Sequence, residues 1–295
     1  MQSILSLNRF TKITPITHGW SSDKKYCVTS NDGTRYFLRI SPKERYEARK
    51  ALFDMLKSVE ELDIPMCSTV EFGVCDEGVY SLQSWIDGVD LEKVLPTLSV
   101  EEQYALGVKS GAILKKIHTI PAPNAQEDWA IRFNKKTDFK IKAYHECDLK
   151  CDGDEHFLEY IESNRHLLEN RPQNFQHGDY HIGNMMLDKD ILSIIDFDRY
   201  DFGDPWEEFN RIVWCAGASP HFATGRLDGY FDGEPPLEFF KLLAFYIAGN
   251  MLYSIPWAIP FGQSEIDTMM RQTQSILRWF DNMQNPIPTW YSTPH

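Results

Sequence analysis

The residues of this chain that could do chemistry are concentrated in two short stretches. Residues 177–184 read HGDYHIGN, and residues 194–198 read IIDFD. This combination suits a reaction in which one carboxylate handles a proton while an amide and a second carboxylate bind a cation. Phosphoryl transfer is such a reaction, because magnesium prefers hard oxygen ligands and needs only one or two of them from the protein. We therefore interpret Asp179 as the proton acceptor, and Asn184 and Asp196 as magnesium ligands.

The elements around these stretches are suited to bringing the three side chains together. The sequence NMMLD, then KD, then ILSIID predicts a short hairpin over residues 184–196. Asp179 and Asn184 precede its first strand, and Asp196 follows its second. The second strand is therefore expected to bring Asp196 back to the end of the hairpin where Asp179 and Asn184 lie.

The N-terminal part of the chain predicts β structure with one helix. Two β-rich runs flank Asn-Asp-Gly at residues 24–40, and two more flank Asp-Glu-Gly at residues 68–85, so each pair indicates a hairpin. Between them, a helix is predicted over residues 42–59, with Ser41 as N-cap and Glu44 completing a capping box. Its apolar face is expected to consist of Ala48, Leu52, Phe53 and Leu56.

The hydrophobic period changes from two to 3.6 after Gly88, which indicates a mostly helical remainder. Ser99 and Glu102 form a second capping box, and a helix with one apolar face follows until Pro121. We predict two parts, a nucleotide-binding lobe at residues 1–88 with a hinge near 83–88, and a helical catalytic and substrate-binding lobe at residues 89–295.

The charge of the chain restricts its partners. Forty-three acidic side chains against 30 basic ones give a formal net charge of −13. Nucleic acid is a poor partner for such a chain, because affinity for it depends on Lys and Arg neutralising phosphates. A cationic small molecule would instead gain from electrostatic attraction.

Other features favour a cytoplasmic location without a membrane span. The six cysteines form no CxxC pair and are interpreted as reduced. The first residues do not resemble a secretory signal. The apolar stretch at residues 242–264 is interrupted by Asn250, Pro256 and Pro260, and it is predicted to be a buried helix that ends at a proline turn.

The motifs that carry the candidate catalytic residues resemble those of a known family. The HGD at 177–179 followed by Asn184 is similar to the catalytic loop of aminoglycoside phosphotransferases, which are kanamycin-kinase-like relatives of protein kinases. IDFD at 195–198 resembles their metal-binding motif, and GDPWEEF at 203–209 resembles their Gly-x-Pro stretch before a helix. The resemblance implies an α+β, bilobal, protein-kinase-like fold, with a small β-rich N-lobe carrying one main helix and a larger, mostly helical C-lobe. It also implies Mg²⁺ and ATP or GTP as cofactors, and a catalytic role for Asp179.

The nucleotide site follows from the same resemblance. The stretch from Thr17 to Tyr26 corresponds to the phosphate-covering loop, although it lacks a full glycine-rich motif. Arg39 stands where kinases carry a lysine, and its expected partner on the following helix is Glu47. The candidate nucleotide contacts are Gly19, Ser21, Ser22, Arg39, Glu47, and the backbones of Ser84 and Ile86 at the hinge.

The sequence indicates the chemical class of the acceptor but not its identity. An aminoglycoside suits the negative charge of the chain, and the acidic segment at 146–155, just before a predicted helix, could bind its amines. This function would give antibiotic resistance. The candidate acceptor contacts are Asp152, Asp154, Glu155, Asp198, Glu207 and Glu208, with Asp228 and Asp232 as further carboxylates.

Several alternatives remain open. Kinases for choline or ethanolamine, homoserine, sugars or macrolides would carry the same motifs. A protein kinase is disfavoured, because residues 195–209 run into a helix with no long activation loop and no Ala-Pro-Glu motif. A nucleotide-binding protein without phosphotransfer activity would be expected to lack Asp179 or Asp196.

Overall fold

The computed structural model describes residues 9–17 and 22–292. The chain divides into two compact units, and each is described by itself. The first unit comprises residues 1–91 and 184–198, and the second comprises residues 92–183 and 199–295. The segment 184–198 therefore belongs with the N-terminal residues although it comes late in the chain.

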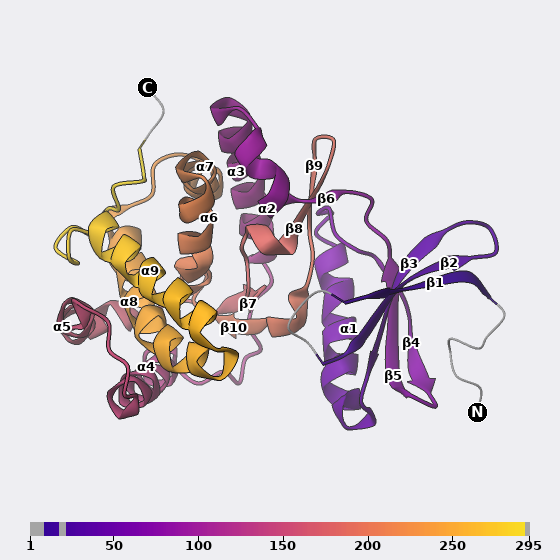
Figure 1. Cartoon of the computed structure of the whole chain (residues 1–295), viewed down its shortest axis with the longest axis horizontal. Helices are drawn as coiled ribbons and strands as arrows, with labels where there is room; N and C mark the ends of the chain where they lie inside the picture. Colours follow the sequence, from indigo (N-terminus) through magenta and orange to yellow (C-terminus); the bar gives the residue numbers. More distant parts are fainter. Residues whose placement is uncertain (1–8, 18–21, 293–295) are drawn as a thin grey trace. The chain divides into compact units, whose positions relative to one another are not determined.

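The first unit is built on a five-stranded antiparallel sheet (Figure 1). In the order in which the strands lie across the sheet, they are β1 (Phe10–Ile16), β2 (Lys24–Ser30), β3 (Arg35–Ser41), β5 (Gly78–Ser84) and β4 (Thr69–Cys75). Both predicted hairpins are confirmed, with β2 paired to β3 and β4 paired to β5. The turn before β5 requires Gly78, since its φ is 145° and an added Cβ would lie 2.0 Å from the carbonyl oxygen of Ser41.

The main helix of this unit, α1 (Tyr46–Glu60), buries one apolar stripe that includes Leu52, Phe53 and Leu56. It begins later than predicted. A 3₁₀ turn, η2 (Lys43–Arg45), precedes it, and Ser41 is the last residue of β3 instead of the helix N-cap. The predicted capping box is therefore wrong.

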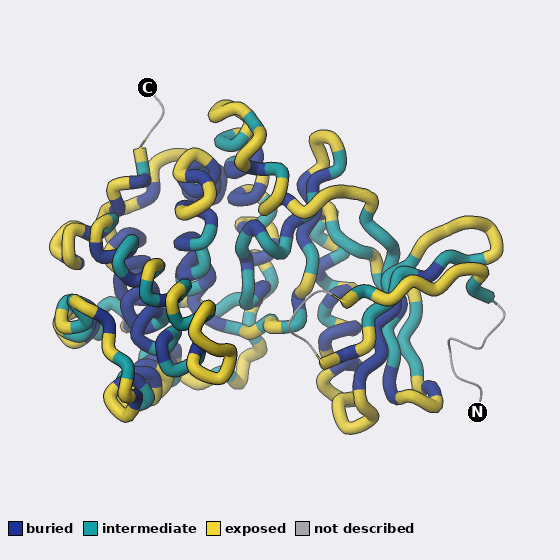
Figure 2. Tube along the Cα trace, viewed as in Figure 1, coloured by how far each residue is buried: buried dark blue, intermediate teal, exposed yellow. Residues whose placement is uncertain are grey.

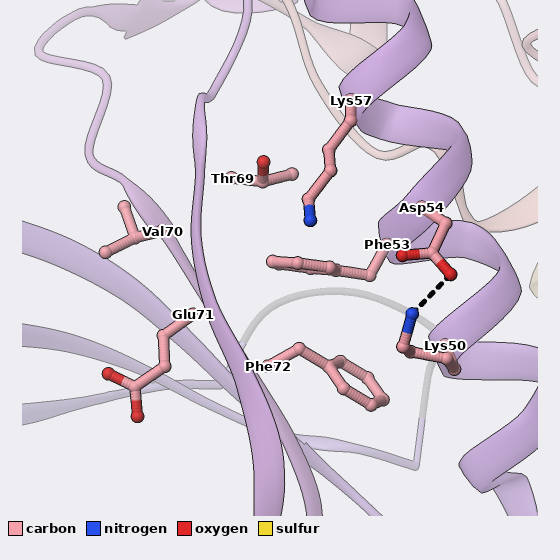
Figure 3. A pocket seen from close by; sticks show the side chains of 8 residues that line it. All are labelled: Lys50, Phe53, Asp54, Lys57, Thr69, Val70, Glu71 and Phe72. Carbon is pink, nitrogen blue, oxygen red and sulfur yellow. Dashed lines mark hydrogen bonds and ion pairs between the residues drawn. The ribbon is translucent and has the colours of Figure 1, made fainter.

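A hollow of about 300 Å³ lies between α1 and the edge strand β4 (Figure 3). Phe53 and Phe72 form its apolar part, with their ring centroids 5.4 Å apart. Lys50 and Asp54 form an ion pair on its rim. None of the candidate site residues lines this hollow.

The second sheet of this unit contains β6 (Val89–Asp90), β8 (Met185–Asp188) and β9 (Ile191–Ile194). The predicted hairpin is confirmed, since Met185 pairs with Ile194 across β8 and β9. The N–H of Ile194 also donates to the carbonyl of Pro65 at 2.9 Å, which ties the hairpin to the N-terminal residues.

The second unit is mostly helical. Its α-helices are α3 (Val100–Ile117), α4 (Trp129–Glu146), α5 (Asp154–Asn164), α6 (Ile212–Ala218), α7 (Pro220–Phe231), α8 (Leu237–Ala258) and α9 (Gln263–Trp279), and the short α2 (Leu91–Val94) precedes them. The predicted capping box at Ser99 and Glu102 is confirmed. Glycines let α3 and α7 pack closely, because a Cβ on Gly107 or Gly225 would lie 2.2–2.3 Å from a carbonyl oxygen of the other helix.

Helix α8 is the core helix of the second unit and is buried along most of its length (Figure 2). Among the described residues it is the one helix long and apolar enough to cross a membrane, and 67% of the apolar window is buried inside the protein. The predicted buried helix is thus present, but it continues through Pro256 and ends at Ala258, before Pro260.

Two short strands that were not predicted from the sequence lie before and after the HGD loop in the chain. They are β7 (Asn174–Gln176) and β10 (Asp201–Gly203), which pair antiparallel. The remaining 3₁₀ segments are η3 (Leu95–Thr97), η4 (Arg165–Leu168), η5 (Ile182–Asn184), η6 (Phe197–Arg199), η7 (Glu207–Arg211) and η8 (Ile259–Phe261). The predicted fold class is confirmed by a sheet-rich unit with one main helix and a mostly helical unit.

Candidate active site

The HGD loop leaves β7 through a turn that only glycine can make. Gly178 has a φ of 83°, and an added Cβ would lie 1.8 Å from the carbonyl oxygen of Arg199. Its N–H donates to the carboxylate of Glu208 at 2.9 Å. Glu208 is buried, so in this structure it holds the loop and is not exposed to an acceptor.

Asp179 lies in the second unit beside three basic side chains. Its carboxylate oxygens are 3.4 Å from Arg211 Nε, 3.6 Å from His181 Nε2 and 3.9 Å from Arg199 Nη1. Burial alone would raise the pKa of the Asp179 carboxyl. The contact with His181 and the charge of Arg211 outweigh burial and hold this pKa below its usual range. Asp179 is therefore a carboxylate at neutral pH.

The two histidines of the motif brace the loop. The N–H of Asp179 donates to His177 Nδ1 at 3.2 Å, and the N–H of Gly183 donates to His181 Nδ1 at 3.1 Å. His177 is fully buried. Both imidazoles accept a backbone hydrogen bond, which fixes the direction of the loop.

A buried aspartate that was not among the predicted site residues, Asp204, supports the start of the HGD loop. Asp204 is fully buried and accepts hydrogen bonds from Arg171 Nε at 2.7 Å, Tyr246 Oη at 2.6 Å and the N–H of Trp206 at 3.0 Å. Its own carbonyl accepts from Gln176, the residue before the HGD motif. The GDP sequence marked this position, but only the fold reveals its partners.

The two predicted magnesium ligands both lie in the first unit, at the base of the β8–β9 hairpin. The N–H of Ile195, the residue before Asp196, donates to the carbonyl of Asn184 at 3.0 Å, so one backbone hydrogen bond joins the two segments that carry these ligands. Asp196 has a φ of 66°, an uncommon conformation for a non-glycine residue that is concentrated at functional sites. Its side chain is 40% exposed. An amide oxygen and an accessible carboxylate make a donor set that fits magnesium.

No cluster of three or more His, Cys, Asp and Glu residues that could hold a metal occurs in residues 9–17 and 22–292. Asn184 and Asp196 form a smaller set, of two protein ligands. A site with one amide and one carboxylate therefore depends on phosphate and water for its remaining ligands.

Arg39 is buried on β3 and contacts aspartates, not the expected Glu47. It donates to Asp198 and lies 3.4 Å from Asp196 Oδ1. Glu47 is exposed on α1. The buried charged residue of this helix is Arg49, which donates to Asp198 at 2.9 Å and to Asp23.

We call Arg39, Arg49, Asp23 and Asp198 the arginine network. Arg49 and Asp23 were not among the site residues predicted from the sequence, and Asp198 was predicted to contact the acceptor. The sequence contained an indication that Arg49 would be buried. It shares one helix face with Leu52, Phe53 and Leu56, at spacings of three, four and seven residues. The predicted Ala48 is exposed, and Arg49 takes its place on the buried face.

The other nucleotide candidates are only partly described. Gly19 and Ser21 lie outside the described residues, and Ser22 is exposed. Ser84 and Ile86 are half-buried at and after the end of β5. The N–H of Ser84 donates to the carbonyl of Ser68 at 2.9 Å, which fixes the start of the predicted hinge.

The acidic acceptor candidates are dispersed over the second unit. Asp152 and Glu155 are exposed, and Asp154, in the first turn of the predicted helix, accepts from Tyr144 at 2.6 Å. Asp228 and Asp232 border another hollow, of about 530 Å³, beside α3 and α7. Asp228 there accepts from Tyr104 and Tyr291, and Asp232 pairs with Lys115.

Glu207 lies among basic residues. Its carboxylate is 3.5 Å from Lys136 Nζ, and the charges of Lys136, Lys140 and Arg211 outweigh burial to lower its pKa. Burial, followed by the charge of Lys136, lowers the pKa of Lys140 to about 7. Its ammonium nitrogen lies 3.3 Å from Asn250 Oδ1. We call Lys136, Lys140 and Arg211 the basic group.

Comparison with known proteins places this geometry in context. A model of the phosphotransferase enzyme family (APH) matches residues 12–240. A search of curated proteins found no match.

Solved structures with similar folds include three aminoglycoside phosphotransferases. One is the GDP complex of a point mutant of the 2′-phosphotransferase-IIIa, with 12% identity, 96% of each chain covered and a TM-score of 0.71. ADP-bound APH(2″)-Ib has 16% identity over 91% of this chain and 95% of its own, with a TM-score of 0.63. A thermostable APH(4)-Ia mutant has 15% identity over 93% and 97%, with a TM-score of 0.65. At these identities the likeness establishes the fold alone.

Proposed function

Because the chain belongs to the phosphotransferase enzyme family, we propose that it is a small-molecule kinase that transfers the γ-phosphoryl group of a nucleoside triphosphate to a hydroxyl of its acceptor. One observation carries this proposal. The HGD loop makes a turn at Gly178 that only glycine can adopt, and the next residue, Asp179, is an ionised carboxylate. The same loop continues directly into Asn184.

In this proposal Asp179 orients the acceptor hydroxyl and takes its proton. A carboxylate with a lowered pKa is a weak base for an unperturbed alcohol. Phosphoryl transfer nevertheless passes through a loose transition state with little covalent chemistry for the protein to do, so positioning dominates. Arg211 and His181 keep Asp179 ionised and fix its direction, which suits that role.

Magnesium would be held by Asn184 and Asp196, and it would neutralise charge on the transferred phosphate. The exposed carboxylate of Asp196 and its positive φ support this assignment. Arg39 would bind phosphate beside it, as an arginine in place of the family's lysine. The hinge residues Ser84 and Ile86, with Gly19, Ser21 and Ser22 in the phosphate loop, remain the proposed nucleotide contacts.

The donor is proposed to be ATP or GTP. Similar structures contain ADP in APH(2″)-Ib, GDP in 2′-phosphotransferase-IIIa, and ATP with streptomycin in APH(2″)-IIa. The boundary of the nucleotide lobe near residue 88 also remains part of the proposal.

An aminoglycoside is the first candidate acceptor. The net charge of −13 favours a polycation, and proteins of the same fold are described with gentamicin and streptomycin. Asp152 and Glu155 are exposed and are the best placed of the acidic candidates for such amines. A cytoplasmic enzyme of this kind would confer antibiotic resistance on its host.

A second candidate acceptor carries a carboxylate as well as a hydroxyl, as homoserine does. The basic group favours it, because Lys136 is 48% exposed and Arg211 contacts Asp179 itself. Lys136 and Arg211 are cations, and Lys140, with a pKa of about 7, carries part of a charge at neutral pH. Together they exceed the single charge of Glu207 and place positive charge next to the proposed catalytic carboxylate. This local charge is opposite to that of the whole chain.

Acceptor-dependent release of ADP or GDP with magnesium tests the proposal. The panel should contain kanamycin, a macrolide, choline, homoserine and a neutral sugar, with Asp179→Ala as the control. We expect turnover with at least one alcohol, and turnover lower by about 100-fold or more with the control. Failure to bind nucleotide, or nucleotide hydrolysis unaffected by every acceptor and by the mutation, would contradict the proposal.

The two acceptor candidates are separated by Lys136→Met. For an anionic acceptor this change should raise KM severalfold, whereas for kanamycin KM should stay the same or fall. Neutralising Asp152 and Glu155 together should have the opposite pattern, raising KM for kanamycin alone.

A further inference from the structure

The arginine network differs in its charges from the lysine–glutamate pair that kinases use to hold a phosphate-binding cation. In this chain the cation on β3 is Arg39, and the buried charged residue of α1 is a second cation, Arg49. We propose that Arg49 is a positioning residue for phosphoryl transfer, which neutralises Asp23 and Asp198 so that these aspartates can hold Arg39 at Asp196. This inference rests on the proposed function.

The contacts form an alternating chain of charges. Asp198 accepts from Arg39 through Oδ2 and from Arg49 Nη1 through Oδ1, the latter at 2.9 Å. Asp23 accepts from Arg49 and lies 3.8 Å from Arg39 Nη1. Each aspartate therefore touches both arginines, and neither arginine is held by a single partner.

Arg49 is itself fixed in place. Its Nε donates to Ser41 Oγ at 2.9 Å, so the hydroxyl that was expected to cap the helix binds a side chain of α1 instead. Its side chain is 6% exposed. Burial, together with the charge of Arg39, lowers the pKa of Arg49 to about 10, so it remains a cation at neutral pH.

The charge balance explains why an arginine is needed on α1. Arg39 and Arg49 offset Asp23 and Asp198, as the lysine and glutamate offset each other in kinases. Without Arg49, Asp198 would keep only Arg39 of these two arginines, and Asp23 would keep the more distant Arg39 and the exposed Arg45. The resulting excess of negative charge would oppose nucleotide phosphates. Breaking one member of a buried ion network leaves its partners uncompensated.

The assignment also changes the role of Asp198. Its oxygens are occupied by two guanidinium groups, whereas Asp196 is 40% exposed and its contact with Arg39 is longer, at 3.4 Å. The first aspartate of IDFD is thus left for magnesium, and the second orients Arg39.

The test compares Arg49→Met and Arg49→Lys with the matched control Arg45→Met. Arg45 also contacts Asp23, at 3.3 Å, but its side chain is 44% exposed and it has no described contact with Asp198. Calorimetry measures the Kd for ADP with and without magnesium, and steady-state kinetics measures kcat and KM. Thermal unfolding is recorded for every variant.

We expect Arg49→Met to raise the Kd for ADP and the KM for the triphosphate by about tenfold or more, and Arg49→Lys to raise them less, because it keeps the charge. Arg45→Met should change them less than about twofold. The double variant Arg49→Met with Asp198→Asn restores the charge balance, so its Kd should fall back part of the way. A purely structural residue would lower Tm without this recovery.

Folded Arg49→Met protein with wild-type Kd and KM would overturn the inference. So would a double variant that binds ADP more weakly than Arg49→Met. If Arg49→Met does not fold, the double variant is compared with the wild type instead, and a Kd for ADP raised about tenfold or more in the folded double variant would overturn the inference. Wild-type protein that binds no nucleotide would instead contradict the proposed function itself.

Discussion

The HGD loop of the second unit and the arginine network of the first unit both place aspartates against basic side chains, but they are assembled differently. In the loop, His181 is two residues from Asp179, and both histidines bond to N–H groups two residues away. The network instead joins residues before β2, on β3, on α1 and after β9. One is local in the sequence, and the other exists only in the folded unit.

This difference has a physical cause. A tight loop satisfies its own backbone groups with nearby side chains, so residue types and spacing are constrained together and form a recognisable motif. A buried ion network needs only matching charges at positions that the fold brings together. Its members have no fixed spacing, and the same balance can be reached with a different pair of residues.

The largest expected effect is the loss of the loop carboxylate. Asp179→Ala should lower kcat by about 10²- to 10⁴-fold, the usual contribution of a general base, and leave the Kd for nucleotide nearly unchanged. Steady-state kinetics and calorimetry on one preparation measure both quantities. More than a tenth of wild-type turnover would remove Asp179 from its assigned role.

The next effect separates the two aspartates of IDFD. Asp196→Asn should weaken magnesium-dependent nucleotide binding by about 100-fold, since it removes the only charged protein ligand of the proposed site. Asp198→Asn should leave the magnesium dependence intact and act through Arg39. A magnesium titration of nucleotide binding distinguishes them, and equal losses would show that the two roles are divided wrongly.

Gly178→Ala examines the backbone of the loop. The added Cβ would lie 1.8 Å from the carbonyl oxygen of Arg199, so the turn must shift and carry Asp179 with it. We expect kcat to fall about 10- to 100-fold, since small displacements of a catalytic group have effects of this size.

Gly33→Ala is the matched control for this change. Gly33 has a φ of 88°, close to the 83° of Gly178, but an added Cβ would meet nothing within 4 Å. It should cost about 1 kcal/mol of stability without changing kcat. Similar kcat losses in both variants would mean that the loss of activity in Gly178→Ala does not come from the contact with Arg199.

The smallest expected effect concerns Lys140, whose pKa is lowered to about 7 from its ordinary 10.5 by burial. Between these values the unfolded chain binds more protons than the folded one, so the free energy of unfolding should rise with pH, and below pH 7 the cost of burying the ammonium is fully present. Lys140→Met should remove this slope and stabilise the protein at neutral pH by about 1–3 kcal/mol. Urea unfolding of both proteins between pH 6 and pH 10 measures it.

Identical pH slopes in wild type and Lys140→Met would contradict the lowered pKa. The comparison with the variant matters because other lysines and tyrosines also titrate at the upper end of this range. Their contribution is common to both proteins and cancels in the difference.

The sequence by itself determined the parts of this protein whose cause is local. The hairpins follow from alternating β-rich runs around residues that tolerate turns, and the start of α3 follows from Ser99 and Glu102 bonding to each other's backbone. The α+β class follows from the change of hydrophobic period. HGD with Asn184 indicated a phosphotransferase because such a loop constrains its residue types and their spacing together.

The tertiary structure decided which charges face one another. From the sequence Glu47 was as plausible a partner for Arg39 as any residue of α1, and Ser41 was an adequate N-cap. The packing of α1 on the sheet turned Arg49 inward and Glu47 outward, and this gave Ser41 and Asp198 a new partner. Asp204 likewise gained its role from Arg171 and Tyr246, which are distant in the chain. Burial makes an uncompensated charge costly, so the fold selects whichever opposite charges it brings within reach.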